Sequence, residues 1–147
     1  MGAAIEVRML ERGDCLRRLA GGGIGRVVYT DSAMPAIQPV NYFLDGEEII
    51  FCTADDSKLV IATRHAIVAF EVDDINGQTR TGWSVVGIGE AYEIVDPTRL
   101  AELAAKLPES WTTYPGAHTV SIPLQVLTGR NRVLADGIAG CLSTRPA

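Results

Sequence analysis

Residues 38–59, QPVNYFLDGEEIIFCTADDSKL, predict two strands joined by a tight turn, and this hairpin indicates a β fold. Asp45-Gly46 stands between the two apolar runs. The pair is a strong hairpin signal because both residues tolerate the positive φ of tight turns. Before the turn, residues 40–45 place an apolar residue at every second position. After it, residues 49–52 are apolar on both faces, so we expect that strand to be buried on both.

Length and composition indicate a single domain with a real core. The chain has 147 residues, of which 47% are hydrophobic, and a domain of this size buries about two-thirds of its unfolded surface. We expect a lead-in over residues 1–9, the domain over 10–135 and a tail over 136–147. With 13 basic and 18 acidic residues the formal charge is −5, which argues against a nucleic-acid partner.

Cysteine and histidine usage indicates no metal site and no disulfide framework. The three cysteines, Cys15, Cys52 and Cys141, stand far apart without a CxxC pair, and His65 and His118 are the only histidines. The N-terminus has no apolar run of signal-peptide length, and no stretch reaches the roughly 18 apolar residues of a membrane span. We therefore expect a cytoplasmic protein with no membrane partner.

The remaining pattern predicts six strands and two or three short helices. Helices are expected over 10–19 and 59–64 and from Asp96-Pro97, an N-cap followed by proline at the first helical position. Outside the hairpin, strands are expected over 25–30, 66–73, 83–94 and 119–128. Glycines at 87 and 89 indicate a bend or a close approach of another backbone, as barrel closure requires. The fold predicted is mainly β: a small six-stranded antiparallel barrel with short flanking helices.

Three stretches raise the question of phosphate binding. Gly21-Gly22-Gly23 follows a helix and precedes a strand, the reverse of a phosphate loop, so we interpret it as a turn. Arg26 begins a strand, where a solvated or salt-bridged arginine is the commoner case. Ser57 and Lys58 precede a helix and could together hold an anion. The alternative is a plain N-cap beside a solvated lysine, and spacing alone leaves both open.

Five motifs, in this order and spacing, resemble one known family. They are Gly25-Arg26, Pro39-Val40-Asn41-Tyr42, Thr53 with Ser57-Lys58-Leu59, Phe70-Glu71-Val72-Asp73 and Gly82-Trp83-Ser84-Val85. Together they resemble the flavin-binding split-barrel proteins related to pyridoxamine 5′-phosphate oxidase, with a closer likeness to the branch of nitroimidazole-resistance-type flavoproteins. The resemblance covers roughly residues 10–130. It implies a split barrel that forms a homodimer with two FMN sites at the subunit interface.

The resemblance also implies which residues bind the cofactor. Pro39, Val40, Asn41 and Tyr42 would lie along the isoalloxazine ring, and the segment with Thr53, Ser57, Lys58 and Leu59 would hold the phosphate. Trp83, Ser84 and Val85 would close the site, contributed by the partner subunit. Asn41 and Ser84 are the candidates for polar contacts to the ring or substrate. Trp83 is a wall of the site or a core aromatic. No catalytic side chain is expected, because hydride passes between the flavin and the substrate.

The function expected is an FMN-dependent oxidoreductase acting on a small, planar, electron-poor molecule, such as a nitroaromatic or quinone. A nicotinamide or a reduced deazaflavin would supply the electrons. Pyridoxamine-phosphate oxidase activity itself is not expected, because the chain lacks that enzyme's additional basic residues and C-terminal segment. Alternatives are a reductase that uses the deazaflavin coenzyme, a flavin- or haem-binding module without turnover, and a dimeric scaffold without cofactor.

Overall fold

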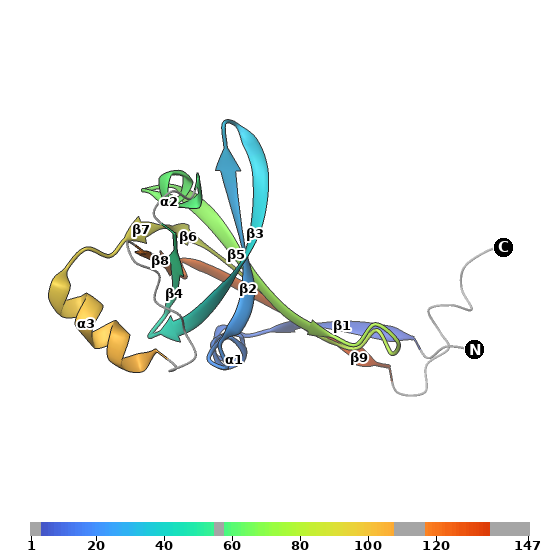
Figure 1. Ribbon diagram of the computed structural model, residues 1–147. Coiled ribbons are helices and arrows are strands. Elements are labelled where there is room, and N and C mark those ends of the chain that lie inside the picture. The colour runs from blue at the N-terminus through green and yellow to red at the C-terminus, as the bar shows by residue number, and fades with distance from the viewer. Residues whose placement is uncertain (1–3, 55–57, 108–116, 136–147) are drawn as a thin grey trace.

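The computed structural model describes residues 4–54, 58–107 and 117–135, with only the backbone described for Lys58. In this part of the chain nine strands form one antiparallel sheet, accompanied by three helices (Figure 1). The strands are β1 Ile5–Leu10, β2 Gly23–Asp31, β3 Met34–Asp45, β4 Glu48–Thr53, β5 Ile67–Ile75, β6 Gly82–Glu90, β7 Tyr92–Glu93, β8 His118–Pro123 and β9 Val126–Leu134. The helices are α1 Arg12–Leu19, α2 Lys58–Thr63 and α3 Pro97–Lys106.

The sheet curls into a split barrel. Its strand order is β1-β9-β6-β5-β2-β3-β4-β8-β7, yet β8 runs into β9 through only two residues. Positions far apart in this order are therefore close in space. The chain turns a corner of the barrel between β8 and β9, close to two glycines of β6. A Cβ on Gly89 would lie 1.7 Å from the carbonyl oxygen of Pro123, and one on Gly87 would lie 2.3 Å from the Leu124 side chain. The close approach expected at these glycines is confirmed.

The core fills the barrel and a smaller space beneath α3. Alternate residues of the strands point inward and are buried, the largest being Tyr42, Phe51 and Phe70. The Tyr42 hydroxyl donates to the carbonyl oxygen of Leu19 at 3.0 Å, so the end of α1 is fastened to the barrel. A second cluster, Ile50, Ile94 and Leu103, packs α3 against the other face of β4.

Several local predictions are confirmed. The turn at Asp45-Gly46 joins β3 to β4, with Gly46 at φ 62°. Helix α3 begins at Pro97, and the Asp96 side chain accepts a hydrogen bond from the Thr98 N–H at 3.2 Å. The mainly β, antiparallel fold is as expected.

The predicted number of six strands was wrong, for three separate reasons. The lead-in was expected over residues 1–9 and a helix from residue 10, but residues 5–10 form β1, which pairs with β9. The predicted strand 83–94 divides at Ala91, whose backbone bonds to His65 and Ala66 while β7 moves to pair with β8. The predicted strand 119–128 divides after Pro123, where the chain turns the barrel corner. The expected tail, residues 136–147, lies outside the described residues.

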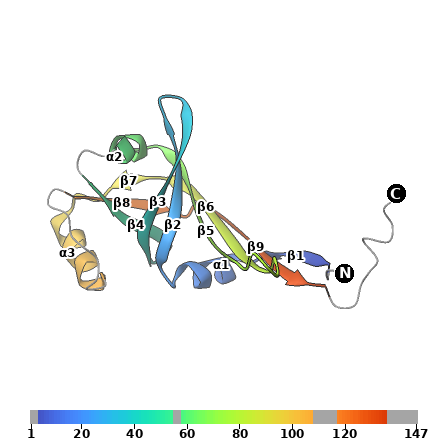
Figure 2. The ribbon, with the colours of Figure 1, turned by 45° about the vertical axis from the view of Figure 1, so that its right-hand side comes forward.

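Two extensions leave the barrel in different directions. The β2–β3 hairpin projects upward in both views, and β1, β9 and the β5–β6 hairpin run out together to the right (Figure 2). Within the ranges described, no helix combines the length and the apolar character that a bilayer crossing would require.

Candidate functional site

The predicted segment 39–42 lies in β3, and its side chains divide between the two faces of the sheet. Val40 and Tyr42 point into the core, whereas Pro39 and Asn41 are exposed on the outer face. Any contact of Val40 or Tyr42 with a cofactor would therefore use the backbone.

That backbone has an open edge. Residues 34–42 pair with β2 on one side, but pairing with β4 on the other begins only at Tyr42. Among the described residues, the strand segment before Tyr42 thus has a strand neighbour on one side only. Such an edge offers unpaired N–H and C=O groups to a ligand.

The predicted phosphate segment is described only at its two ends. Thr53 ends β4 and is buried, and Leu59 packs in the core. Lys58 begins α2, while Ser57 lies outside the described residues. The structure therefore describes where the chain enters this segment, at Thr53, and where it leaves it, at Leu59.

The predicted segment 83–85 in β6 is also divided. Val85 is buried, Ser84 lies on the outer face between Asp73 and Arg130, and Trp83 packs against the core from the inner face. Strands β2 and β5 separate β6 from β3. At the usual strand spacing, Ser84 is about 14 Å along the sheet from the 39–41 segment of the same chain.

A charged cluster occupies the outer face between these segments. Arg26 lies 3.2 Å from Glu71 and 3.5 Å from Asp73, so the salt-bridged interpretation of Arg26 is confirmed. Burial and the neighbouring Asp73 raise the pKa of Glu71 to about 7. Glu71 and Asp73 belong to one of the five motifs, but their pairing beside Arg26 was not predicted. Their spacing of two on one strand was the available signal, since it places both carboxyls on one face.

Next to this cluster lies a row of aliphatic residues that crosses five strands. Strand register sets them directly side by side on the outer face. The exposed fractions of three of them are large: 66% for Ile37, 37% for Ile88 and 51% for Val126. An open groove of about 260 Å³ runs along part of the row. The row consists of Ile37, Val28, Ala69, Ile88 and Val126, and we call it the aliphatic row.

Two other polar clusters are internally paired. Glu93 contacts His118 Nδ1 at 2.8 Å and Arg64 Nη2 at 3.3 Å, and the hydrogen bond with His118, with a further contribution from Arg64, lowers the pKa of Glu93. His118 lies opposite Thr53 in the sheet. This cluster therefore stands at the entry to the predicted phosphate segment.

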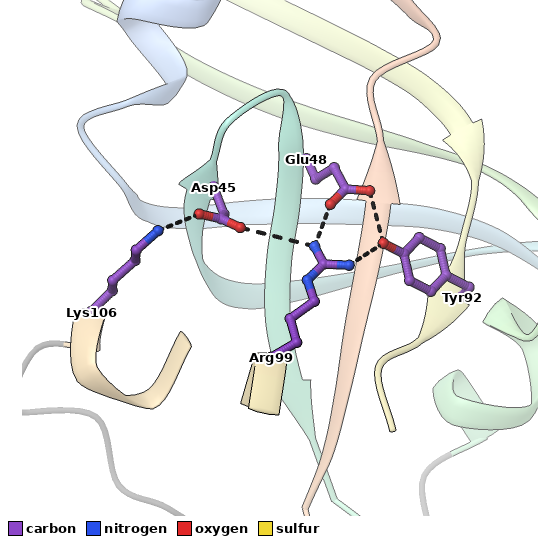
Figure 3. Close-up of polar contacts among 5 residues, drawn as sticks. All are labelled: Asp45, Glu48, Tyr92, Arg99 and Lys106. Atoms are coloured by element: carbon purple, nitrogen blue, oxygen red, sulfur yellow. Dashed lines mark hydrogen bonds and ion pairs between the residues drawn. The ribbon is translucent and has the colours of Figure 1, made fainter. Parts of the chain in front are cut away.

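The second of these clusters fastens α3 to the barrel (Figure 3). Arg99 bonds to Glu48 and to the Tyr92 hydroxyl, which itself donates to Glu48 at 2.8 Å. Lys106 Nζ lies 2.6 Å from Asp45. Hydrogen bonds to Tyr92 and Glu48 raise the pKa of Arg99. Since these charges are satisfied by one another, we assign the cluster a structural role.

Comparison with known proteins gives relatives that match most of the chain. A model of the pyridoxamine 5′-phosphate oxidase family matches residues 11–131. The uncharacterised protein Rv0080 of Mycobacterium tuberculosis is 37% identical over 139 residues, covering 91% of this chain and 90% of that protein. The structure of an FAD binding protein from Mycobacterium smegmatis is 31% identical, with a TM-score of 0.71, and the match covers 85% of this chain and 98% of that one.

The fold is shared more widely than the sequence. A candidate 5-nitroimidazole antibiotic resistance protein from Bacteroides thetaiotaomicron matches with a TM-score of 0.69 at 13% identity, covering 89% of this chain and 90% of that one. At this identity the likeness concerns the fold alone. The family match and the relatives above 30% identity, together with the split barrel, confirm the resemblance drawn from the five motifs. The chain belongs to the pyridoxamine 5′-phosphate oxidase family.

Proposed function

We propose that this protein is a homodimeric flavoprotein that binds FMN and reduces a small, planar, electron-poor molecule such as a nitroaromatic or a quinone. The observation that carries the proposal is the open edge of β3 beside an exposed, partly apolar sheet face. Unpaired backbone groups can bond the polar edge of a flavin ring, while neighbouring aliphatic side chains give it a flat support. Pro39 and Asn41 add exposed side chains on the same face.

The phosphate of the cofactor is assigned to the segment that joins β4 to α2. Ser57 would accept or donate a hydrogen bond and Lys58 would contribute positive charge. Thr53 and Leu59 are buried at the two ends of this segment, so we assign them the role of fixing its ends.

The homodimer in this proposal is supported by the aliphatic row. Isolated exposed aliphatic residues are ordinary, but a contiguous row beside a groove is typical of a buried interface. A second copy packed on this face would also bring Ser84 of the partner subunit to the site, whereas Trp83 and Val85 lie on the inner face of β6 and could meet the cofactor only through their backbone. The separation of about 14 Å along the sheet between β3 and β6 explains why one chain alone would not complete it.

A bound flavin would supply hydride transfer. The protein's own part would be to bind and orient the ring through the β3 backbone, hold the phosphate at Lys58 and exclude water with the aliphatic row.

The test is an absorption spectrum of the protein purified without added cofactor, followed by titration of the flavin-free protein with FMN and, separately, FAD. Flavin bands, or saturable quenching of FMN fluorescence at one flavin per chain, are the expected result. A protein that binds neither flavin would contradict the proposal and favour the deazaflavin, haem or scaffold alternatives. A protein that binds flavin but is reduced by no nicotinamide or deazaflavin would instead be a binding module.

FAD is the second candidate cofactor. The M. smegmatis structure that is 31% identical to this chain is that of an FAD binding protein. Releasing the bound flavin by heat and separating it by chromatography distinguishes FMN from FAD directly.

Lys58→Ala is expected to weaken FMN binding by about tenfold or more, because a charge-assisted hydrogen bond to phosphate is lost. Riboflavin, which has no phosphate, should bind both proteins alike. The matched control is Lys106→Ala, which removes an equal charge from α3. If Lys58→Ala left FMN affinity unchanged, the phosphate assignment would be wrong.

A further inference from the structure

A cavity of about 300 Å³ lies between α1 and β6, lined by Asp14, Arg17, Arg18 and Trp83. Trp83 lies on the inner face of β6, the face opposite to Ser84. The cavity is therefore on the other side of the sheet from the proposed flavin face of the same chain. Its volume is at the lower end of the range for small-molecule pockets.

Arg18 is the feature of this cavity that packing does not explain. Its guanidinium carbon lies 5.4 Å from the centre of the Trp83 ring, a cation–π arrangement. Its Nε is buried, and no group among the described residues accepts a hydrogen bond from it. More than nine in ten buried polar groups have a partner, and an unsatisfied charged donor is among the costlier exceptions. Arg18 is therefore the residue of this cavity whose hydrogen bonds are incomplete among the described residues.

The charges around the cavity favour an anion. Arg17 is paired with Asp14 one helical turn away, so these two charges compensate each other. Arg18 has no carboxylate partner among the described residues, and its charge remains for a ligand. The two terminal nitrogens of a guanidinium form a planar fork that matches the two oxygens of a carboxylate. Trp83 provides an apolar wall beside it.

We propose that the cavity between α1 and β6 is a binding site for a small carboxylate with a flat, apolar body, held by Arg18 and packed against Trp83. Arg17 at the rim gives further positive charge when its contact with Asp14 opens. The inference does not depend on the flavin assignment, since it concerns the inner side of β6.

The test uses calorimetric titration of the full-length protein with benzoate, and with benzamide as the uncharged analogue. Saturable benzoate binding is expected, with benzamide binding at least about tenfold weaker because it lacks the charge. Arg18→Gln should weaken benzoate binding by a similar factor. Arg64→Gln, which removes an equal charge from an exposed site elsewhere, should leave it unchanged.

Two further measurements test the proposal independently of the Arg18→Gln variant. The Arg18 Nε–H resonance, assigned by its loss in Arg18→Lys, should shift on addition of benzoate while the flavin absorption of the loaded protein does not change. Arg18→Lys also serves if Arg18→Gln does not fold, since it keeps the charge but removes the planar fork. Absence of saturable binding, or binding that survives both substitutions at Arg18, would overturn the proposal.

Discussion

The Glu71 side chain is expected to make the stability of the folded protein depend on pH. Its carboxyl is partly buried and lies beside Asp73, so its pKa rises from 4.5 to about 7, with Arg26 acting against the rise. Between these two pH values the folded protein holds a proton that the unfolded chain has lost. Folding is therefore linked to proton uptake, and stability should fall as the pH rises through this interval.

Glu71→Gln is expected to flatten the dependence of the melting temperature on pH between about 4.5 and about 7. Glutamine keeps the shape of the protonated carboxyl and cannot ionise. Glu102→Gln, an exposed position on α3, changes the charge equally and should follow the parent protein. A parent whose melting temperature rises across this interval, with the same slope in Glu71→Gln, would show that another group dominates.

Gly89 is the residue on which the barrel corner depends most directly. A Cβ there would lie 1.7 Å from the carbonyl oxygen of Pro123, a backbone atom that cannot swing aside. Gly89→Ala should therefore lower the free energy of unfolding by about 3 kcal/mol or more. Gly77 in the β5–β6 turn has no atom near an added Cβ, so Gly77→Ala is the matched control. Equal urea midpoints for the two variants would contradict this account of the corner.

At the scale of the element, α3 shows how two kinds of contact hold one helix. Leu103 buries its apolar side in the small cluster with Ile50 and Ile94, and Arg99 holds the polar side through Glu48 and Tyr92 (Figure 3). Arg99 and Glu48 are each about three-quarters buried. This pair should therefore contribute more to the free energy of unfolding than an exposed salt bridge, which contributes about 0–1 kcal/mol.

Arg99→Ala is expected to destabilise the protein by about 1–2 kcal/mol in urea unfolding, because Glu48 is left without its cation. Lys106→Ala, whose side chain is 59% exposed, should cost less than about 1 kcal/mol. Equal losses of stability in the two variants would mean that burial of the Arg99–Glu48 pair does not strengthen that salt bridge.

Some elements could be predicted because their signals are local. Asp45-Gly46 and Asp96-Pro97 each define a turn or a helix start within a few residues, and both are found where expected. β1 was missed because most of its side chains are exposed and its partner lies about 120 residues away in the sequence. The division at Ala91 was missed for a related reason, since it depends on backbone bonds to residues 65 and 66.

At the scale of the whole molecule, our proposal needs a second chain to complete the flavin site. The outer face of the sheet carries the open edge of β3, the Arg26 cluster and the aliphatic row. Sequence motifs could indicate candidate segments for binding a cofactor. They could not show that Val40, Tyr42 and Val85 point into the core or that Ser84 lies on another part of the face, because side-chain direction depends on strand register.

Ile88→Glu, in the centre of the aliphatic row, is expected to convert the proposed dimer to a monomer and to weaken flavin binding in parallel. A charge cannot be buried at such a position without a partner. Val95→Glu, on an exposed position before α3, should alter neither property. Sedimentation velocity with flavin absorbance as a second signal measures both. A dimeric Ile88→Glu protein would place the interface elsewhere.

The pairing of β1 with β9 has a consequence for the order in which the protein can be made. Ile5 pairs with Leu134 and Leu10 with Gly129, and β9 also covers the edge of β6. While the ribosome is still synthesising the chain, β1 has no strand to join and β6 keeps an open edge until β9 emerges. Contacts between distant parts of a chain form late, and open strand edges promote aggregation. The nascent chain is therefore most exposed to chaperones just before β9 appears.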